Sequence, residues 1–389
     1  MKTNLRHLRV FLAVAETGSI TRAGELCHVS QPAVTQVVGK LERAAAQPLF
    51  LRRPQGLFPT PGGEALAVRV RRAFSYLDPP LDALAPRLRH VASYSQLQAL
   101  IAMCEAENFT LAARQMGLAQ PTVHRAISQL EQIAGRSIFE RTAHGMLASR
   151  AALALAHGAR LAIAELELAE ADLAELLGRE VGRIVVGAMP LSRSCVLPQA
   201  IARFRTRHPD LPIQVVEGPY GDLLSDLRRG AIDLLIGALR EPAPIDDVEQ
   251  HPLFQDSLVL VARPQHPLMG RPGIKVSDLA QFPFIVPFDG TPTRSAFDRL
   301  FGGCTTQPSL IETASMILMR ELLRISDHIG CISGAQVAAE VQLGVVEKLR
   351  FKMKDTVRTI GITHRSDWIP TKLQHTFVSE LRLASANID

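Results

Sequence analysis

The chain has 389 residues, of which 47% are hydrophobic and 21% charged, proportions that are typical of folded globular domains and exclude a disordered chain. Its net charge is +5, and the basic excess lies at the N-terminus: residues 1–93 carry +7, residues 94–150 carry +1 and residues 151–389 carry −3. The length predicts two to four domains, and the basic N-terminus predicts a polyanionic partner.

The five cysteines are widely spaced, and no CxxC or Cys/His cluster occurs. This pattern predicts free thiols in a reducing compartment and no metal site. Arg6 and Arg9 interrupt the N-terminal apolar residues, which argues against a signal peptide, and no run of about 18 uncharged apolar residues predicts a membrane span. We therefore expect a cytoplasmic protein without a cofactor or a membrane contact.

The first third of the chain contains an internal repeat. An ungapped comparison at an offset of 89 residues gives 14 identical pairs between residues 8 and 60 and their equivalents. The identical pairs include Leu8/Leu97, Glu16/Glu105, Pro32/Pro121, Glu42/Glu131, Arg52/Arg141 and Gly56/Gly145. A period of this length indicates a duplicated small domain and not a solenoid.

Each copy has the pattern of a helix-turn-helix followed by a hairpin. In the first copy, apolar residues from Leu8 to Ala15 recur at helical spacing, and Gly18 ends that helix. A short helix, a tight turn at Val29-Ser30 and a third helix follow, and residues 49–58 predict two strands joined by a turn. The expected winged helix-turn-helix domains cover residues 1–65 and 94–150.

The third helix of each copy has the side chains of a DNA-reading helix. Amides and hydroxyls pair with base edges, small side chains permit close approach, and basic side chains reach phosphates. The expected DNA-contacting residues are Gln31, Ala33, Thr35, Gln36, Lys40, Arg52 and Arg53 in the first copy, and Gln120, Thr122, His124, Arg125, Gln129 and Arg141 in the second. The alternative is an ordinary three-helix domain with a polar exposed side.

Residues 66–93 predict the beginning of a helix and then a connector, because Pro79, Pro80 and Pro86 are expected to break the helix. Residues 151–178 predict a long helix rich in Ala, Leu and Glu. Such a helix either pairs with a second copy of the chain or lies buried inside its own domain, and its length favours pairing with a second copy.

From residue 182 to residue 386, strand and helix patterns alternate, which predicts an α/β domain with a mostly parallel sheet. The chain is expected to cross into a second lobe around Arg263-Pro264 and to return near Val345. The second lobe would then cover about residues 265–344.

These patterns resemble the LysR-type transcriptional regulators. The motifs that carry the resemblance are Gly18–Gly24, Val29–Thr35, Leu41-Glu42, Leu49-Phe50 and Thr60–Gly63 in the first copy, Ala119–Val123, Leu130-Glu131 and Ile138-Phe139 in the second, and Leu197-Pro198 and Gly230–Leu234 in the C-terminal region. The second copy departs from the family pattern at Ser149–Ala151. The family normally has one such N-terminal domain, so the duplication is a departure as well.

The resemblance implies a sequence-specific DNA-binding transcription regulator with a long dimerisation helix and a two-lobed effector domain of the periplasmic-binding-protein (type II) kind. Its implied partners are promoter DNA, a small-molecule effector, a second copy of the chain in a homodimer or homotetramer, and RNA polymerase. An alternative is a regulator in which one helix-turn-helix copy binds DNA and the other mediates protein contacts.

Ligands of open α/β sheets bind beyond the carboxyl ends of strands, near helix N-termini. Three loops of the C-terminal region meet this description, and their hydroxyls and arginines predict an anionic, carboxylate-bearing effector. The expected ligand-binding residues are Leu191, Ser192, Arg193, Ser194, Pro219, Tyr220, Thr291, Thr293 and Arg294. The hydroxyls of Ser192 and Thr293 can equally cap helices, and Cys195 beside them is either a redox sensor or, as we favour, an inert thiol.

Motifs of the common enzyme classes are missing from the sequence. No Walker loop, GxSxG or HExxH occurs, nor a GxGxxG after a strand, and the 12 histidines are scattered. A solute-binding protein would share the C-terminal fold, but it would need an export signal and no helix-turn-helix. We therefore expect a regulator and not an enzyme.

Overall fold

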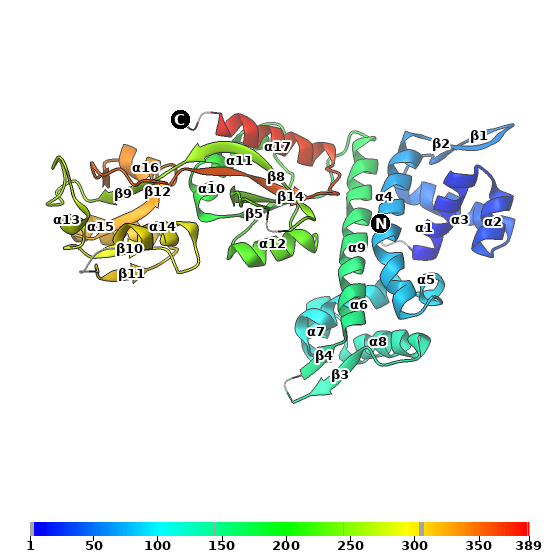
Figure 1. The fold of residues 1–389 in the computed structure, drawn as a ribbon. Coiled ribbons are helices and arrows are strands. Elements are labelled where there is room, and N and C mark those ends of the chain that lie inside the picture. Colours follow the sequence, from blue (N-terminus) through cyan, green and yellow to red (C-terminus); the bar gives the residue numbers. More distant parts are fainter. Residues whose placement is uncertain (1–3, 144, 244, 303–306, 387, 389) are drawn as a thin grey trace. The chain divides into compact units, whose positions relative to one another are not determined.

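The computed structural model describes residues 4–143, 145–243, 245–302, 307–386 and 388 (Figure 1). The chain forms two compact units: the N-terminal unit ends at Arg183, and the C-terminal unit comprises Ile184–Arg228 and the residues from Ile232 onward. Cys304 lies outside the described residues. None of the helices in these described ranges could span a lipid bilayer.

The N-terminal unit contains one series of elements twice: three helices, an antiparallel hairpin and a long helix. The first series is α1 (Leu5–Thr17), α2 (Ile20–Cys27), α3 (Gln31–Ala45), β1 (Phe50–Arg53), β2 (Gly56–Pro59) and α4 (Pro61–Leu84), with the short α5 (Leu88–Val91) after it. The second is α6 (Tyr94–Ala106), α7 (Phe109–Met116), α8 (Gln120–Ala134), β3 (Phe139–Thr142), β4 (Gly145–Ala148) and α9 (Arg150–Glu175). We call Leu5–Pro59 the first three-helix unit and Tyr94–Ala148 the second.

The backbone hydrogen bonds of the two three-helix units repeat at the offset of 89 residues. The N–H of Leu57 in the first hairpin donates to the carbonyl oxygen of Gly18, which follows α1, over 2.8 Å. The N–H of Met146 donates in the same way to the carbonyl oxygen of Glu107, also over 2.8 Å. The repeat seen in the sequence is therefore also a repeat of local backbone geometry.

The expected helix break at Pro79 and Pro80 is wrong, because α4 continues through both prolines to Leu84. An interior proline costs about 3 kcal/mol. Leu77, Leu81 and Leu84 share one side of the helix and are almost fully buried, and burial of each contributes about 1.5–3 kcal/mol. Their packing offsets much of the cost of the prolines, and the expected connector shrinks to residues 85–93.

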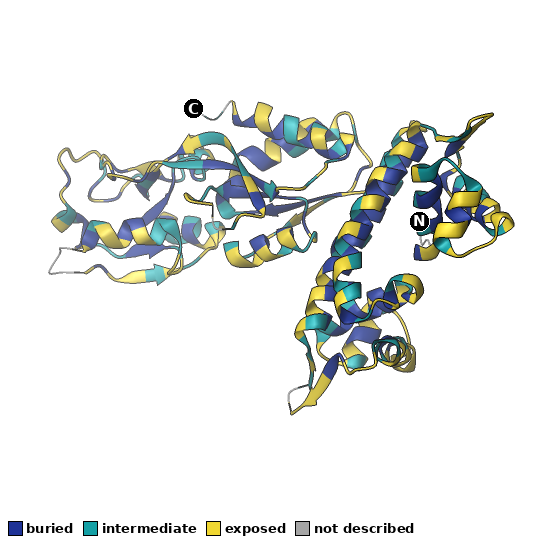
Figure 2. Cartoon of the chain, turned by 45° about the vertical axis from the view of Figure 1, so that its right-hand side comes forward, coloured by how far each residue is buried: buried dark blue, intermediate teal, exposed yellow. Residues whose placement is uncertain are grey.

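The long helix α9 packs along α4 of the same chain (Figure 1). Both helices belong to one hydrophobic cluster, which also contains the cores of the two three-helix units and extends from Leu5 to Leu173. Figure 2 shows buried residues along the length of α9. The structure therefore favours the interpretation of this helix as buried inside its own unit, because its apolar side is covered without a second copy.

The C-terminal unit has two lobes, each built on a five-stranded sheet. The first sheet contains β5 (Ile184–Ala188), β6 (Ile213–Val216), β7 (Leu234–Ala238), β8 (Val248–Asp256) and β14 (Arg358–Arg365) in the order β6-β5-β7-β14-β8. The second contains β9 (Leu258–Ala262), β10 (Phe284–Val286), β11 (Leu310–Glu312), β12 (Ile329–Ser333) and β13 (Glu347–Lys348) in the order β11-β10-β12-β9-β13. Their helices are α10 (Pro190–Ser194), α11 (Val196–Arg205), α12 (Tyr220–Arg228), α13 (Val276–Leu279), α14 (Pro292–Phe301), α15 (Met316–Ile325), α16 (Ala338–Gln342) and α17 (Lys372–Ser385).

Both sheets are mixed, and the expectation of a mostly parallel sheet agrees with their strand directions. Four of the five strands in each sheet run in one direction, whereas β14 in the first sheet and β9 in the second run antiparallel to their two neighbours. The chain crosses between the lobes at Ser257, between β8 and β9, and returns after β13. The second lobe is therefore larger than the expected 265–344, because a strand pattern does not reveal the sheet in which a strand pairs.

The register places the loops expected to bind an effector on the side of this crossover. Ala238, at the end of β7, pairs with Ile360 near the beginning of β14, and Ser333, at the end of β12, pairs with Leu258 at the beginning of β9. Strands β5 and β6 run parallel to β7, and β10 runs parallel to β12. The carboxyl ends of the parallel strands of both sheets therefore face the crossover, where open α/β sheets bind ligands.

Candidate DNA-binding and effector-binding sites

The side chains expected to contact DNA lie on the outer sides of α3 and α8. In α3, Val34, Val38 and Leu41 are buried in the core, and in α8 Val123 and Ile127 are buried in the same way. The exposed residues among those expected are Gln31, Thr35, Gln36, Lys40, Arg52, Arg53, Gln120, Thr122, His124, Arg125, Gln129 and Arg141, and Ala33 is half-buried. Each unit thus has a polar helix side that is free of core packing.

Two of these side chains in α8 are held against their own unit. The ring of His124 lies 5.1 Å from that of Phe109, and its Nδ1 is 3.4 Å from the hydroxyl of Ser128. The side-chain oxygen of Gln129 accepts a hydrogen bond from Gln96 over 3.1 Å. These contacts restrict His124 and Gln129 more than the spacing of the sequence suggested.

One glutamate in each unit fixes the hairpin to the third helix, a role that motif matching did not assign. The Oε1 atom of Glu42 accepts hydrogen bonds from the N–H groups of Leu49 and Phe50 over 2.9 and 3.3 Å. Glu131 accepts from the two equivalent N–H groups over 2.9 and 3.4 Å. The motif identity at these two positions could have revealed the role, because a buried backbone N–H needs an acceptor.

Hydrogen bonds of two side chains join the first series of elements in the N-terminal unit to the second. The two side chains occupy equivalent positions, but one donor lies in the first series and the other in the second. Nε2 of Gln47, just after α3, donates to the carbonyl oxygen of Leu173 in α9 over 2.9 Å. Nη2 of Arg136, the equivalent of Gln47, donates to the carbonyl oxygen of Ala83 over 3.1 Å and to the carbonyl oxygen of Leu84, the equivalent of Leu173, over 3.4 Å. A contact from one half to the other is thus matched by the reverse contact, which is the pattern of an approximate twofold axis.

Buried charges also join α4 to α9. Arg69 is only 2% exposed, and its guanidinium lies 3.1 Å from a carboxylate oxygen of Glu165 and 2.7 Å from one of Asp172. Arg72 lies 3.0 Å from the other oxygen of Glu165, which is also 2% exposed. The cations come from α4 and the anions from α9, so each helix supplies counter-charges for the other.

In the first lobe, the expected ligand-binding residues have different surroundings. Ser192 is fully buried and its hydroxyl donates to the carbonyl oxygen of Met189 over 2.8 Å, which favours a structural role. Leu191 is buried as well, whereas Ser194 and Pro219 are exposed. Arg193 forms an ion pair with Glu217.

Tyr220, like Arg193 at its Nε atom, has a buried polar atom without a hydrogen-bond partner among the described residues. Its hydroxyl is buried and makes no hydrogen bond of ordinary geometry among the described residues. The guanidinium of Arg240, which follows β7, lies 4.6 Å from the centre of its ring. Burial raises the pKa of Tyr220, and the positive charge of Arg240 opposes that shift. A buried hydroxyl beside a cation is a suitable contact for an anionic ligand.

In the second lobe, Arg294 is already paired with acidic side chains. Its guanidinium lies 2.8 Å from the carboxylate of Asp298 and forms a second ion pair with Glu312, and both contacts raise the pKa of Arg294. Thr291 caps α14, since its hydroxyl accepts from the N–H of Arg294 over 3.2 Å. The expectation that Arg294 holds an effector carboxylate therefore loses support, because two carboxylates of the chain occupy its donors.

Asp256 and Arg358 tie the two lobes together at the crossover, and the sequence analysis missed both. The buried carboxylate of Asp256 accepts from the hydroxyl of Ser333 over 2.8 Å and from Arg358 over 3.2 Å. Arg358 also donates to the hydroxyl of Thr293 over 3.0 Å. These residues lie far apart along the chain and form no motif, so only the folded structure brings them together.

Cys195 is a half-buried free cysteine near Asp256 of this network. Its Sγ donates to the carbonyl oxygen of Leu191 over 3.2 Å. Burial, with a contribution from the negative charge of Asp256, raises the pKa of Cys195 to about 11. The thiolate is the reactive form of cysteine, so the structure favours an inert thiol over a redox sensor.

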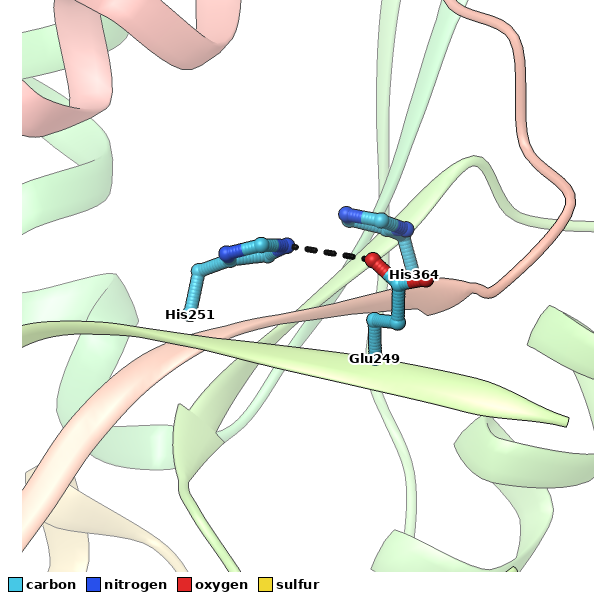
Figure 3. Close-up of side chains that lie close together, drawn as sticks. All are labelled: Glu249, His251 and His364. Atoms are coloured by element: carbon cyan, nitrogen blue, oxygen red, sulfur yellow. Dashed lines mark ion pairs between the residues drawn. The ribbon is translucent and has the colours of Figure 1, made fainter. Parts of the chain in front are cut away.

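Glu249, His251 and His364 form the one cluster among the described residues with the ligand set of a metal site (Figure 3). Their ligand atoms all lie within 4.8 Å of one another. Glu249 and His251 are on β8, and His364 is opposite Glu249 on β14. Two imidazoles and a carboxylate suit Zn²⁺ better than Mg²⁺. Spacing along the sequence did not reveal the cluster, because its members come from two strands.

Family models match both parts of the chain. One described as "LysR substrate binding domain" matches residues 177–385. Another, described as "Bacterial regulatory helix-turn-helix protein, lysR family", matches residues 5–64 and again residues 94–153.

Known proteins resemble the chain to different extents. The HTH-type transcriptional regulator GalR of Pseudomonas putida is 34% identical over 368 residues, which are 93% of this chain and 92% of that protein. The regulator PcaQ of Agrobacterium fabrum is 28% identical over 298 residues, 76% of this chain and 96% of that protein. The match to PcaQ thus takes in nearly all of PcaQ and leaves about a quarter of this chain unmatched.

Solved structures share the fold. Full-length OxyR from Pseudomonas aeruginosa covers 76% of this chain and 96% of its own, with a TM-score of 0.56 and 22% identity. Full-length CbnR in complex with its target DNA covers 75% of this chain and 99% of its own, with a TM-score of 0.51 and 21% identity. At these identities the likeness concerns the fold alone.

Proposed function

The chain belongs to the LysR family of bacterial transcriptional regulators, and from this premise we propose that both three-helix units are winged helix-turn-helix domains that dock on DNA, while the C-terminal unit binds a small anionic effector. The chain is a DNA-binding regulator of transcription, and its named relatives are regulators and not enzymes. In this proposal α3 and α8 are the reading helices, and the two hairpins are the wings.

The observation that carries this proposal is the matched placement of the two units. The exchanged contacts of Gln47 and Arg136 relate α3 and α8 by an approximate twofold axis, and both helices expose polar side chains. Twofold-related reading helices fit dyad-related half-sites in successive major grooves. Gln36 and Lys40 of α3, and Arg125 of α8, are the side chains that we expect to reach bases and phosphates.

A second candidate assigns DNA contact to one unit and protein contact to the other. The second unit favours this alternative, because residues 94–150 carry a net charge of only +1 and because His124 and Gln129 are held against their own unit. In that case the first, basic unit would bind DNA.

Footprints on the DNA upstream of the gene separate the two candidates. If both units dock, Gln36→Ala/Lys40→Ala and Thr122→Ala/Arg125→Ala remove protection from different halves of the site, and the control Lys348→Ala/Arg350→Ala leaves the footprint intact. If only one pair of substitutions alters the footprint, only the unit that carries this pair contacts DNA. A chain that protects no upstream DNA, even at low salt, contradicts the proposal.

For the effector, we place the anion at the crossover side of the two lobes. Tyr220 with its buried hydroxyl, Arg240 beside it, and Thr293 held by Arg358 support this position. Closure of the lobes around the ligand would shift a conformational equilibrium and so change transcription. Homodimers or homotetramers and contact with RNA polymerase follow from the family resemblance, and such assemblies would use surfaces other than the paired sides of α4 and α9.

Thermal unfolding with a panel of monocarboxylates and dicarboxylates tests the effector site. A carboxylate that raises the Tm of the unmodified chain should lose this effect with Tyr220→Phe or Arg240→Met and keep it with Arg294→Met. If instead Arg294→Met alone abolishes the stabilisation, Arg294 is the carboxylate-binding residue and the proposed position is wrong.

A further inference from the structure

Resting on the proposed DNA-binding function, we infer that one chain supplies both heads of a twofold-related DNA-binding pair and reads two half-sites of different sequence. Helices α4 and α9 then form, inside a single polypeptide, the contact for which two identical chains would otherwise be needed. The apolar side of each long helix is occupied by the other long helix of the same chain.

The buried charges favour the pairing of α4 with α9 over the pairing of like helices. Two α4 helices from two chains would bring together Arg69 and its copy without a carboxylate, and two α9 helices would bring together Glu165 and its copy without a cation. A buried charge without a partner is strongly destabilising. At the offset of 89 residues Arg69 is matched by Gly158 and Arg72 by Leu161, so the two arginines that face Glu165 from α4 have no counterparts in α9.

Packing at Gly158 also favours the pairing of α4 with α9 over the pairing of two α4 helices. A Cβ atom at Gly158 would lie 2.4 Å from the carbonyl oxygen of Tyr76 and 3.0 Å from Cγ of Pro80, so the two helices approach closely only because this position has no side chain. In a pair of two α4 helices, the equivalent position is Arg69, whose long side chain would meet the same atoms. Residues 85–149 also keep α4 and α9 in one chain, which raises the effective concentration of each for the other.

The two reading helices present different side chains at equivalent positions. Gln36 of α3 corresponds to Arg125 of α8, and Lys40 corresponds to Gln129. Glutamine pairs with adenine and arginine with guanine through two hydrogen bonds in the major groove. The preferred operator should therefore have dyad-related spacing without being a palindrome.

Symmetrised operators test this inference with the unmodified chain. Once a footprint has located two half-sites, two further duplexes are made in which either half-site replaces the other as an inverted copy. The natural duplex should bind at least tenfold more tightly than both symmetrised ones, since each mismatched base pair weakens binding several-fold. A symmetrised duplex that binds as tightly as the natural one overturns the inference. Failure of all three duplexes to bind contradicts the proposed function itself.

A mixing experiment tests whether one chain provides both heads. Gln36→Ala and Arg125→Ala chains, each weakened at a different half-site, are combined in equal amounts and titrated with the natural duplex. If both heads come from one chain, the mixture binds no more tightly than its components, because every chain has one defective head. A tightly binding fraction in the mixture would show that two chains share the operator and would overturn the inference.

A different observation supports a second site. We propose that Glu249, His251 and His364 bind one divalent transition-metal ion such as Zn²⁺. Nδ1 of His364 lies 2.8 Å from the carbonyl oxygen of Arg365, and because a carbonyl only accepts, Nδ1 carries the proton and Nε2 presents its lone pair. A hydrogen bond of this kind typically orients metal-binding histidines.

The surroundings of the two histidines leave them suited to a metal ion. The ring of His251 stacks on that of His364 at 4.8 Å, and Nε2 of His251 lies 3.7 Å from a carboxylate oxygen of Glu249. The ligand atoms of the three side chains therefore lie close enough together to bind one ion.

Calorimetric titration of the full chain with ZnCl₂, and with MgCl₂ for comparison, tests this site. One Zn²⁺ should bind per chain and Mg²⁺ should not, because nitrogen ligands favour Zn²⁺. His364→Ala should weaken Zn²⁺ binding at least tenfold, and the control His375→Ala, on the exposed side of α17, should not change it. Zn²⁺ binding that is unaltered by His364→Ala, or absent from the unmodified chain, overturns the proposal.

Discussion

The two three-helix units share the hydrogen bonds that hold their hairpins in place and differ in their exposed residues. Glu42 and Glu131 hold equivalent hairpins to equivalent helices, yet position 36 is glutamine in one unit and its equivalent, Arg125, is arginine in the other. Buried backbone N–H groups need acceptors in any folded unit, so the bonds that satisfy them recur. Exposed side chains are not constrained in this way, and two reading helices can therefore differ without cost to the fold.

The largest effect is expected where the two halves meet. Glu165→Ala leaves the buried Arg69 and the half-buried Arg72 without their shared carboxylate and should lower the free energy of unfolding by about 3–5 kcal/mol. Urea denaturation measures this change. The control Glu167→Ala removes an exposed side chain, which is 63% accessible, and should change stability by less than about 0.5 kcal/mol. Equal effects of the two substitutions would show that α4 and α9 do not pair through Glu165.

A smaller, matched pair of effects is expected inside the units. Glu42→Ala and Glu131→Ala each remove a charged acceptor from two backbone N–H groups and should each destabilise the chain by about 1.5–3 kcal/mol. The midpoints and slopes of urea unfolding curves measure both. If one substitution lowers the free energy of unfolding and the other leaves it unchanged, the two glutamates do not have equivalent structural roles.

Substitutions at exposed positions should change the DNA sequence preference of the two units differently, although the hydrogen bonds that hold their hairpins are equivalent. Arg125→Ala should cost about 1–3 kcal/mol of DNA-binding free energy and relax the sequence preference at one half-site, whereas Gln36→Ala should do so at the other. Titration of duplexes with single base changes measures the two preferences. Loss of preference at the same base pair in both variants would contradict a separate reading role for each unit.

Equivalent arginines on the two hairpins should contribute similarly to DNA affinity, whatever the base sequence of the DNA. Arg52→Gln and Arg141→Gln should each reduce the slope of the logarithm of affinity against the logarithm of salt concentration by about 1, because each removes one phosphate contact. Binding assays between about 50 and 200 mM salt measure this slope. A slope that only Arg52→Gln reduces would place the second hairpin away from DNA.

The smallest expected effect is a pH dependence of stability that arises from a histidine of the first unit without an equivalent in the second. Burial and Lys40 lower the pKa of His7, whose equivalent in the second unit is Gln96, a residue that does not titrate. Because the folded state disfavours protonated His7, its contribution to stability is complete above the ordinary pKa near 6.5 and is lost as the pH falls below that value. His7→Gln should therefore reduce the difference in Tm between pH 7.5 and pH 5.5. An unchanged difference would assign the pH dependence to other groups.

The local elements of the N-terminal unit could be predicted from the sequence to within a few residues. Periodic apolar residues and turn signals placed α1, α2, α3 and the hairpin, and the 89-residue offset placed their second copies. The continuation of α4 through Pro79 and Pro80 could not be predicted in this way, because local propensity opposes it and burial of Leu77, Leu81 and Leu84 against the rest of the unit offsets much of that opposition.

In the C-terminal unit, the sequence indicated the strands and the loops that follow them, but not the partners of individual side chains. Arg294 was expected to bind a carboxylate ligand, and it meets Asp298 and Glu312 of its own chain. Asp256 and Arg358 lie 102 residues apart and carry no motif, although they join the two lobes. Long-range ion pairs leave no periodic signal in a sequence, so folding alone reveals them.

The sequence by itself determined the family, the repeat of 89 residues and the polar residues on the outer side of each third helix, because these depend on spacing along one helix or hairpin. The tertiary structure decided that α9 lies against α4, with Arg69 facing Glu165 and with Gly158 against the backbone of Tyr76. That arrangement depends on which apolar sides and which buried charges satisfy each other across space, a property that spacing along the chain does not encode.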